Sequence, residues 1–238
     1  MSKNSPLLSI IVPCYQERHR LDACVQGLQQ AVHSAGLSAE MIIVDDGSTD
    51  GTAEYARQLV TPFKNAVVLE TPHRGKGAAL QTGVSASKGD FVFIADADWS
   101  MPPEQIQRFL PPNAESFGLA IANREHPESR RINEPFYRHA LGRCFNAFVQ
   151  RLLLEGIEDS QCGYKCLDGA LAREIFPKIQ CAGWAFDVEL ILLARQAGAP
   201  IIEVPIDWNF DPDSRIQPIR DALQMARDVI AIRRRHNH

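Results

Sequence analysis

The sequence has no long apolar run and no strong net charge, and each absence removes a class of protein. No stretch approaches the roughly 20 apolar residues of a membrane-spanning helix. A net charge of −4 gives no general attraction to nucleic acid, so no such partner is expected. The first residues are polar and lack the apolar segment of a secretory signal. We therefore expect a cytoplasmic protein, which could also rest on the membrane without crossing it.

Paired cysteine motifs are also missing. The cysteines are scattered, at Cys14, Cys24, Cys144, Cys162, Cys166 and Cys181. Only Cys162 and Cys166 lie close together, and no second ligand pair accompanies them, whereas structural zinc sites usually draw on two close pairs. Free thiols in a reducing compartment are expected instead.

What the chain does contain is an alternation of short apolar runs with helical patterns. The apolar runs lie at 7–12, 41–44, 66–69, 91–95 and 119–122. Helical spacing occurs between them at 21–32, 50–59 and 77–86. This alternation predicts βαβ units and a mostly parallel sheet flanked by helices. Asp50 is expected to be the N-cap of the second helix.

The second half has a different pattern but no linker before it. Helices are predicted at 137–154, 167–176, 186–197 and 216–235, with a late strand at 201–206. We predict a single α/β domain over residues 7–236. Its nucleotide-binding half would be 7–124, and its acceptor-handling half 125–236.

Two acidic clusters follow two of the apolar runs. Asp45 and Asp46 follow the run 41–44, and Asp96-Ala97-Asp98 follows the run 91–95. Ligands of open α/β sheets bind at the carboxyl ends of strands. Asp96 and Asp98 could share a Mg²⁺ or Mn²⁺ that bridges to a nucleotide diphosphate. The alternative is a solvated loop, because Asp-x-Asp is frequent by chance.

Basic residues are expected at the same edge. His73-Arg74-Gly75-Lys76-Gly77 stands at a predicted helix start, which favours anions. It matches neither a P-loop nor a dinucleotide fingerprint, so a plain glycine turn is the alternative. Arg124 ends another strand, and Arg130 and Arg131 follow in what we predict to be a polar loop. Arginine suits bidentate phosphate contacts.

In their order along the chain, these motifs resemble glycosyltransferase family 2, which has the Rossmann-like GT-A fold with a mixed sheet. Residues 13–17 are similar to the family's Pro-x-Tyr-Asn-Glu element, with Gln16 in place of Asn. Residues 45–48 and the Asp-x-Asp match the family directly. Segments 159–165, 184–190 and 203–208 resemble the dolichyl-phosphate and polyprenyl-phosphate β-glucosyltransferases.

The resemblance implies an inverting transfer of a hexose from a nucleotide sugar to a polyprenyl or dolichyl phosphate. Glucose from UDP-glucose is favoured, and GDP-mannose is the second candidate. A soluble hydroxyl acceptor is an alternative that would need a general base such as Asp187. A protein that binds nucleotide sugars without catalysis is a further alternative, which the intact Asp96 and Asp98 disfavour.

The resemblance also implies roles for individual residues. Asp96, Asp98 and Asp187 would be catalytic, and Asp96 and Asp98 would bind the metal, Mg²⁺ or Mn²⁺. The nucleotide sugar would be bound by Pro13, Tyr15, Glu17, Asp45, Asp46, Lys76, Asp96, Ala97, Asp98, Arg124 and Arg215. The acceptor and sugar side would be formed by Arg131, Gln161, Gly163, Lys165 and Trp184.

The last predicted helix is amphipathic. Its apolar side is formed by Ile216, Ile219, Leu223, Ala226, Ile230 and Ala231. Positive charge comes from Arg220, Arg227, Arg233, Arg234 and Arg235. One interpretation is a helix that packs on the domain and ends in a basic tail. The other is that the arginine cluster contacts an anionic membrane surface.

Overall fold

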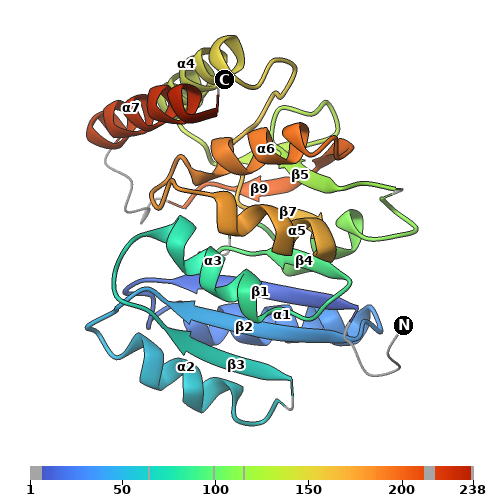
Figure 1. Ribbon diagram of the computed structural model, residues 1–238. Coiled ribbons are helices and arrows are strands. Elements are labelled where there is room, and N and C mark those ends of the chain that lie inside the picture. Colours follow the sequence, from blue (N-terminus) through green and yellow to red (C-terminus); the bar gives the residue numbers. More distant parts are fainter. Residues whose placement is uncertain (1–6, 64, 99, 115, 212–217, 237–238) are drawn as a thin grey trace.

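The computed structural model describes residues 7–63, 65–98, 100–114, 116–211 and 218–236, and a seven-stranded sheet is its central element (Figure 1). The strands are β1 (Leu8–Cys14), β2 (Ala39–Asp45), β3 (Ala66–Glu70), β4 (Phe91–Ile94), β5 (Leu119–Asn123), β7 (Lys165–Asp168) and β8 (Ile201–Pro205). Their spatial order is β3-β2-β1-β4-β7-β5-β8. Only β7 runs antiparallel to its neighbours, so the predicted mixed, mostly parallel sheet is confirmed.

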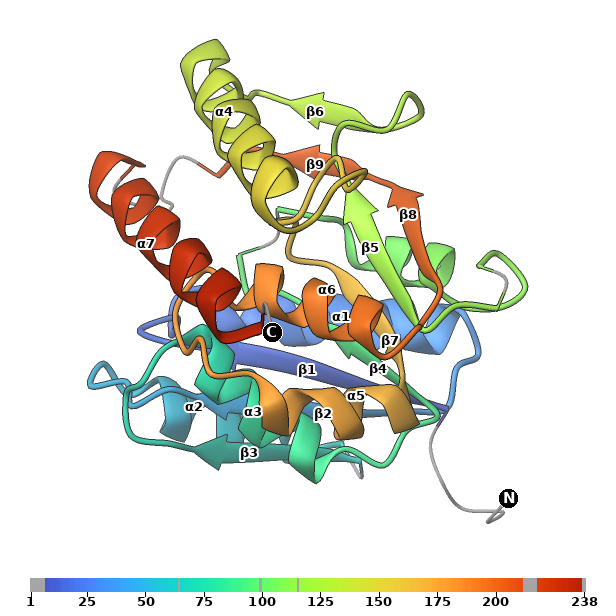
Figure 2. The same cartoon turned by 45° about the horizontal axis from the view of Figure 1, so that its top comes forward.

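Helices cover both faces of the sheet. The α-helices are α1 (Leu21–Ser34), α2 (Thr52–Val60), α3 (Lys76–Ala86), α4 (Phe136–Leu152), α5 (Gly169–Ile175), α6 (Phe186–Gln196) and α7 (Pro218–His236). Two 3₁₀ helices, η1 (Pro103–Phe109) and η2 (Phe176–Lys178), complete the set among the described residues. One core cluster lies under α1, α2 and η1, and the other under α3, α5 and α6. Figure 2 shows α4 and α7 side by side, outside these layers.

The apolar runs are continuous because the central strands are buried on both faces. In β1, Ile10 and Val12 belong to one core cluster, whereas Ile11 belongs to the other. Side chains alternate across a strand, so a strand covered on both sides needs apolar residues at successive positions. This explains why the runs could be recognised from the sequence.

The parallel register brings the predicted site residues to one edge. Cys14 pairs with Asp45, and Ile11 of β1 pairs with Ile94 of β4. The residues that follow these strands therefore leave the sheet at the same carboxyl edge, where the two acidic clusters meet the 13–17 turn.

Three local predictions were wrong. The helix predicted over 167–176 begins later, because residues 165–168 form the inserted strand β7, which is too short to show a periodic pattern. Arg130 and Arg131 belong to a strand, β6 (Arg130–Ile132), which pairs with β9 (Asp207–Asn209) from the far end of the chain. The N-cap of α2 is Gly51, with a φ of 83°, whereas Asp50 binds Thr52 through its side chain.

Helix α7 also packs through a different side from the predicted apolar one. Val229 and Ile232 are its fully buried residues, whereas Leu223 and Ile230 are exposed. Ile216 lies outside the described residues, as does the side chain of Ile219. No helix in the described part of the chain is both long and apolar enough to cross a membrane.

Candidate active site

A cavity of about 640 Å³ opens at the carboxyl edge of the sheet. Most of the residues predicted from the sequence line it: Pro13, Tyr15, Glu17, Asp46, Lys76, Asp96, Ala97, Asp98, Arg124, Arg131, Gln161, Gly163, Trp184 and Asp187. Asp45 and Lys165 lie behind its wall. Arg215 lies outside the described residues. The cavity therefore joins motifs from both halves of the chain.

The Asp-x-Asp carboxylates lie close together, and Lys76 forms an ion pair with one of them. Lys76 Nζ lies 2.6 Å from Asp96 Oδ1, and Asp98 Oδ1 accepts a hydrogen bond from the backbone N–H of Ser100 at 3.0 Å. Burial and the neighbouring Asp96 raise the pKa of Asp98. Burial alone would lower the pKa of Lys76, but Asp96 and Asp187 outweigh it and raise that pKa. The cluster thus has more negative charge than Lys76 neutralises.

These residues fit a hard divalent cation. Two carboxylates at the rim of a cavity offer the oxygen ligands that Mg²⁺ uses together with substrate phosphates and water. Among the described residues, no group of three or more histidine, cysteine or acidic side chains could hold a metal. The remaining ligands would therefore have to come from a bound diphosphate and water.

The side chain of Asp46 holds the turn that directly precedes Lys76. Its carboxylate accepts hydrogen bonds from the backbone N–H groups of Arg74, at 2.9 Å, and Gly75, at 2.8 Å. His73 Nδ1 lies 2.8 Å from the same carboxylate. Gly75 has a φ of 108°, which favours glycine. Asp46 therefore fixes the start of α3, and through it the position of Lys76.

Next to the ends of β1 and β2, the structure places a buried acceptor and an aromatic pair. Asp45 is almost fully buried, its Oδ2 accepts from the Ser48 backbone N–H at 2.9 Å, and its Oδ1 has no hydrogen-bond partner among the described residues. Tyr15 stacks on His73 with ring centroids 4.1 Å apart. This region has the buried acceptor and flat surface that a nucleoside could use.

Gln16, which stands where the family pattern has Asn, makes hydrogen bonds to the loop after Asp45. Its φ of 57° lies in the left-handed region, where Asn is tolerated better than most residues. Its side-chain Nε2 donates to Thr49 Oγ1 at 2.9 Å, and its backbone N–H donates to Ser48 Oγ at 2.8 Å. The longer side chain thus joins the 13–17 turn to the loop that follows Asp45.

Lys165, behind the cavity wall, forms a buried ion pair with Asp187. Their Nζ and Oδ1 atoms are 2.6 Å apart, and Lys165 Nζ also donates to the Cys162 carbonyl at 2.5 Å. Burial raises the pKa of Asp187, although Lys165 and Lys76 oppose the effect. Lys165 therefore positions Asp187, which lines the cavity.

Arg124 is held by a residue that the sequence analysis did not single out as a site residue. Asp159 accepts from Arg124 Nε at 2.7 Å and from Nη2 at 2.9 Å. Burial would raise the pKa of Asp159, but Arg124 outweighs it and lowers that pKa to about 2. Both Arg124 and Arg131 stack on Trp208. A signal was present, because Asp159 opens the segment 159–165 that carries the resemblance.

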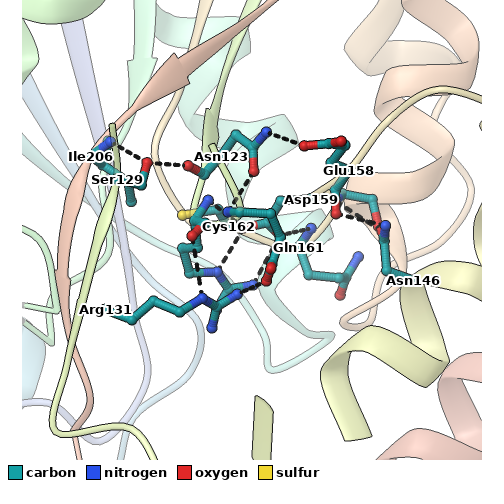
Figure 3. Close-up of polar contacts among 12 residues, drawn as sticks. Asn123, Ser129, Arg131, Asn146, Glu158, Asp159, Gln161, Cys162 and Ile206 are labelled. Atoms are coloured by element: carbon teal, nitrogen blue, oxygen red, sulfur yellow. Dashed lines mark hydrogen bonds and ion pairs between the residues drawn. The ribbon is translucent and has the colours of Figure 1, made fainter. Parts of the chain in front are cut away.

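A polar network connects this arginine to α4 (Figure 3). Asn146 of α4 donates to the backbone carbonyls of Ile157, at 3.1 Å, and Glu158, at 2.7 Å, directly before Asp159. On the other side, Glu125 pairs with Arg131 and lies 3.2 Å from His139 of α4. These contacts were not predictable, because they join segments that are distant in the sequence.

Comparisons with known proteins identify the family of the chain. Residues 9–176 match the model of glycosyl transferase family 2. The dolichyl-phosphate beta-glucosyltransferase of Dictyostelium discoideum is 34% identical over 245 residues, which cover 96% of this chain and 74% of the relative. The human protein of the same name is 31% identical, covering 96% of this chain and 75% of its own length.

Solved structures show the same fold. Glucosyl-3-phosphoglycerate synthase from Mycobacterium tuberculosis, in complex with Mn²⁺, UDP-glucose and phosphoglyceric acid, superposes with a TM-score of 0.69 at 20% identity. The match covers 97% of this chain and 79% of that one. Mannosyl-3-phosphoglycerate synthase from Rubrobacter xylanophilus gives 0.68 at 21% identity, covering 97% and 73%. The predicted GT-A fold is confirmed, and the chain belongs to glycosyl transferase family 2.

Proposed function

We propose that this protein is an inverting glucosyltransferase that moves glucose from UDP-glucose to a polyprenyl or dolichyl phosphate. The observation that carries the proposal is the similarity, over nearly the whole chain, to proteins named dolichyl-phosphate beta-glucosyltransferase. The cavity adds support, because it brings the Asp-x-Asp carboxylates, Arg124 and Arg131 together.

The donor occupies the edge formed by β1, β2 and β4. Pro13, Tyr15, Glu17 and Asp45 take the nucleoside, and Asp46 holds the loop that presents Lys76. Asp96, Ala97 and Asp98 face the diphosphate, and Asp96 and Asp98 hold Mg²⁺ or Mn²⁺. A cation held there would stabilise the negative charge that develops on the leaving diphosphate. Solved structures of the same fold that contain UDP together with Mn²⁺ or Mg²⁺ support the use of a divalent cation. Arg215 remains a proposed phosphate contact from the sequence alone.

The acceptor phosphate lies toward Arg124 and Arg131, with Gln161, Gly163, Trp184 and Asp187 on the sugar side. One phosphate oxygen forms a bond to C1 of the sugar while the bond from C1 to the diphosphate oxygen breaks. This displacement inverts the configuration at C1. A phosphate is already anionic at neutral pH, so no proton has to be removed. The ion pair with Asp159 fixes the guanidinium of Arg124, and positioning of this kind lowers the barrier.

A soluble hydroxyl acceptor is the second candidate, and the state of Asp187 favours it. A hydroxyl nucleophile needs a general base, and burial raises the pKa of Asp187 toward the range in which a carboxylate accepts a proton effectively. The two candidates differ in a measurable way. With a phosphate acceptor, Asp187→Asn should keep the pH profile of kcat, whereas with a hydroxyl acceptor the variant should lose its acid limb.

We further propose that the protein works at the cytoplasmic face of a membrane as a peripheral protein, because its lipid acceptor resides there. Arg233 and Arg234 of α7 are exposed and can contact anionic headgroups. Arg235 is different, because its Nη2 lies 3.5 Å from the buried Glu189.

The experiment is transfer from labelled UDP-glucose and, separately, labelled GDP-mannose to undecaprenyl or dolichyl phosphate. Labelled lipid extracted into organic solvent from UDP-glucose alone would support the proposal. Labelled lipid from GDP-mannose alone would show that the donor is GDP-mannose and not UDP-glucose. No labelled lipid with either donor, combined with transfer to a water-soluble acceptor, would overturn the lipid acceptor. Asp98→Asn is the control for adventitious activity.

A further inference from the structure

We propose that the hydrocarbon chain of the acceptor leaves the active site between α4 and α7. The passage is called here the α4–α7 groove, and it is lined by Tyr137, Leu141, Phe145, Ala222 and Met225. The inference rests on the proposed function, because it takes the acceptor to be a prenyl phosphate.

The groove is continuous with the candidate active site. The five residues that define it line the same cavity as Asp96, Arg124 and Asp187. Figure 2 shows the two helices running alongside one another, and both contribute side chains to the lining of the cavity. A ligand whose phosphate reaches Arg124 could therefore extend between the helices without leaving the cavity.

The apolar residues are arranged along one side of each helix. Tyr137, Leu141 and Phe145 are four residues apart, and so form one stripe of α4, which continues to the fully buried Val149. Ala222 and Met225 are three residues apart on α7. The inner end of the α4 stripe packs in the core, whereas Tyr137 and Leu141 at its outer end line the cavity and are exposed.

Both helices are weakly covered by the rest of the protein. In the 17 residues of α4, only Asn146 and Val149 are buried. Phe136 and Tyr137, at its first turn, are 85% and 66% exposed, and Leu223 of α7 is 59% exposed. Tyr137 also lines the cavity, and exposed large apolar side chains at the edge of a cavity mark a binding surface.

Polarity changes along the passage in the direction that a prenyl phosphate requires. At the inner end, Arg124, Arg131 and Arg143 lie with His139 of α4, and Glu125, Glu134 and Asp159 form ion pairs with these arginines. The outer end has the apolar residues of the α4–α7 groove, together with Asp221 of α7. An anionic head joined to a hydrocarbon tail matches both ends at once, whereas a sugar or phosphoglycerate would use only the inner one.

The direct test is photolabelling of the wild-type chain in detergent micelles, without donor. The probe is a farnesyl phosphate analogue with a diazirine at the end of its chain. Mass spectrometry should find the label in peptides of residues 136–152 and 218–236, and excess unlabelled farnesyl phosphate should suppress it. Label on other segments, or label that the competitor does not suppress, would overturn the groove.

This test separates the groove from the proposed function. Competed labelling of α4 and α7 without glucose transfer from any donor would support the groove and contradict the function. Glucose transfer to the probe with labelling elsewhere would do the reverse. A bilayer is absent from both measurements, so docking on a membrane surface cannot produce the labelling pattern.

A kinetic test uses two acceptors that differ in chain length. In Leu141→Gln and Met225→Gln, kcat/KM for farnesyl phosphate should fall about tenfold more than kcat/KM for the shorter dimethylallyl phosphate, because the longer chain buries more apolar surface. The control is Val67→Gln, on the exposed face of β3, which should match the wild type with both acceptors. An equal loss with both acceptors, or no loss, would contradict the groove.

Discussion

Gly163 leaves the space that the carboxylate of Asp96 occupies. A Cβ atom built on Gly163 would lie 1.8 Å from Asp96 Oδ2 and 2.7 Å from its Cγ. No side chain can be accommodated there unless Asp96 moves. The second half of the chain therefore fixes the position of a carboxylate contributed by the first half.

Gly163→Ala should disable the site without unfolding the protein. The new methyl group has to displace Asp96, and a misplacement of this size costs about 10²-fold in rate. The strain should lower the stability of the fold by ~1–3 kcal/mol. Transfer assays measure the loss of rate, and thermal unfolding measures the loss of stability. Mn²⁺ titration tests whether the displaced Asp96 still binds the metal. Gly142→Ala is the matched control for Mn²⁺ binding, because nothing lies within 4 Å of a Cβ there.

Asp98→Asn should stabilise the metal-free protein and abolish its response to metal. The pKa of Asp98 is raised in the folded state, so ionisation of this carboxyl at neutral pH opposes folding, and removal of its charge relieves the repulsion from Asp96. Activity should fall by about 10²-fold, as when one electrostatic contact of a transition state is lost. Thermal unfolding with and without Mn²⁺ is the measurement. A normal increase in Tm on adding Mn²⁺ would contradict the assignment.

The Asp-x-Asp and its edge could be predicted from the sequence because both depend on local pattern. A buried parallel strand leaves a continuous apolar run, and the residue after it must lie at the carboxyl edge. Asp96 and Asp98 therefore had one possible location. Gly163 could be named through the family resemblance, but its contact with Asp96 could not, since it depends on how β7 inserts beside β4.

Lys165→Met should cost about 3–5 kcal/mol of stability, because it leaves the Asp187 carboxylate buried without its partner. Adding Asp187→Leu to this variant should recover most of the loss, since an apolar pair needs no mutual compensation. Chemical denaturation of the two single variants and the double variant forms the cycle. Additive losses in the double variant would show that the two side chains do not stabilise each other.

The Arg124–Asp159 pair should make stability depend on acidic pH. The folded pKa of Asp159, about 2, lies below its ordinary value of 3.8, so its contribution is complete above pH 4 and disappears as pH falls toward 2. Asp159→Asn should therefore lower stability by about 2 kcal/mol at pH 7, and by less as pH decreases. Urea unfolding from pH 7 to pH 3 tests this. A difference that is constant over the range would indicate that the ion pair is not its cause.

The less predictable part of the site consists of partners that only the tertiary structure defines. Arg124 was expected from its place after a strand, but its partner Asp159 and the surface of Trp208 come from segments far along the chain. Strands β6 and β9 are each too short for a periodic pattern, and they form by pairing with one another. The inserted β7 was masked in the same way by the helical pattern that follows it.

The arginines at the end of α7 should have two different roles, one in the stability of the fold and one in membrane binding. Arg235 Nη2 lies 3.5 Å from Glu189 Oε1, and His236 Nε2 lies 2.7 Å from the same oxygen. Glu189 in turn accepts from the backbone N–H groups of Gln180 and Cys181, which precede the cavity residue Trp184. Arg235→Ser should therefore lower Tm and loosen this loop.

Arg233 and Arg234 are exposed, so their charges are available to a membrane surface. Replacing both with Ser should leave Tm unchanged and weaken binding to vesicles with anionic lipid by ~1 kcal/mol for each residue at low salt. Cosedimentation with anionic and neutral vesicles at several salt concentrations measures the effect. Arg57→Ser on α2, which removes one charge that pairs with Glu70, is the net-charge control for Arg233→Ser and Arg234→Ser taken singly. If both single variants and Arg57→Ser bind anionic vesicles equally, the end of α7 does not contact the membrane.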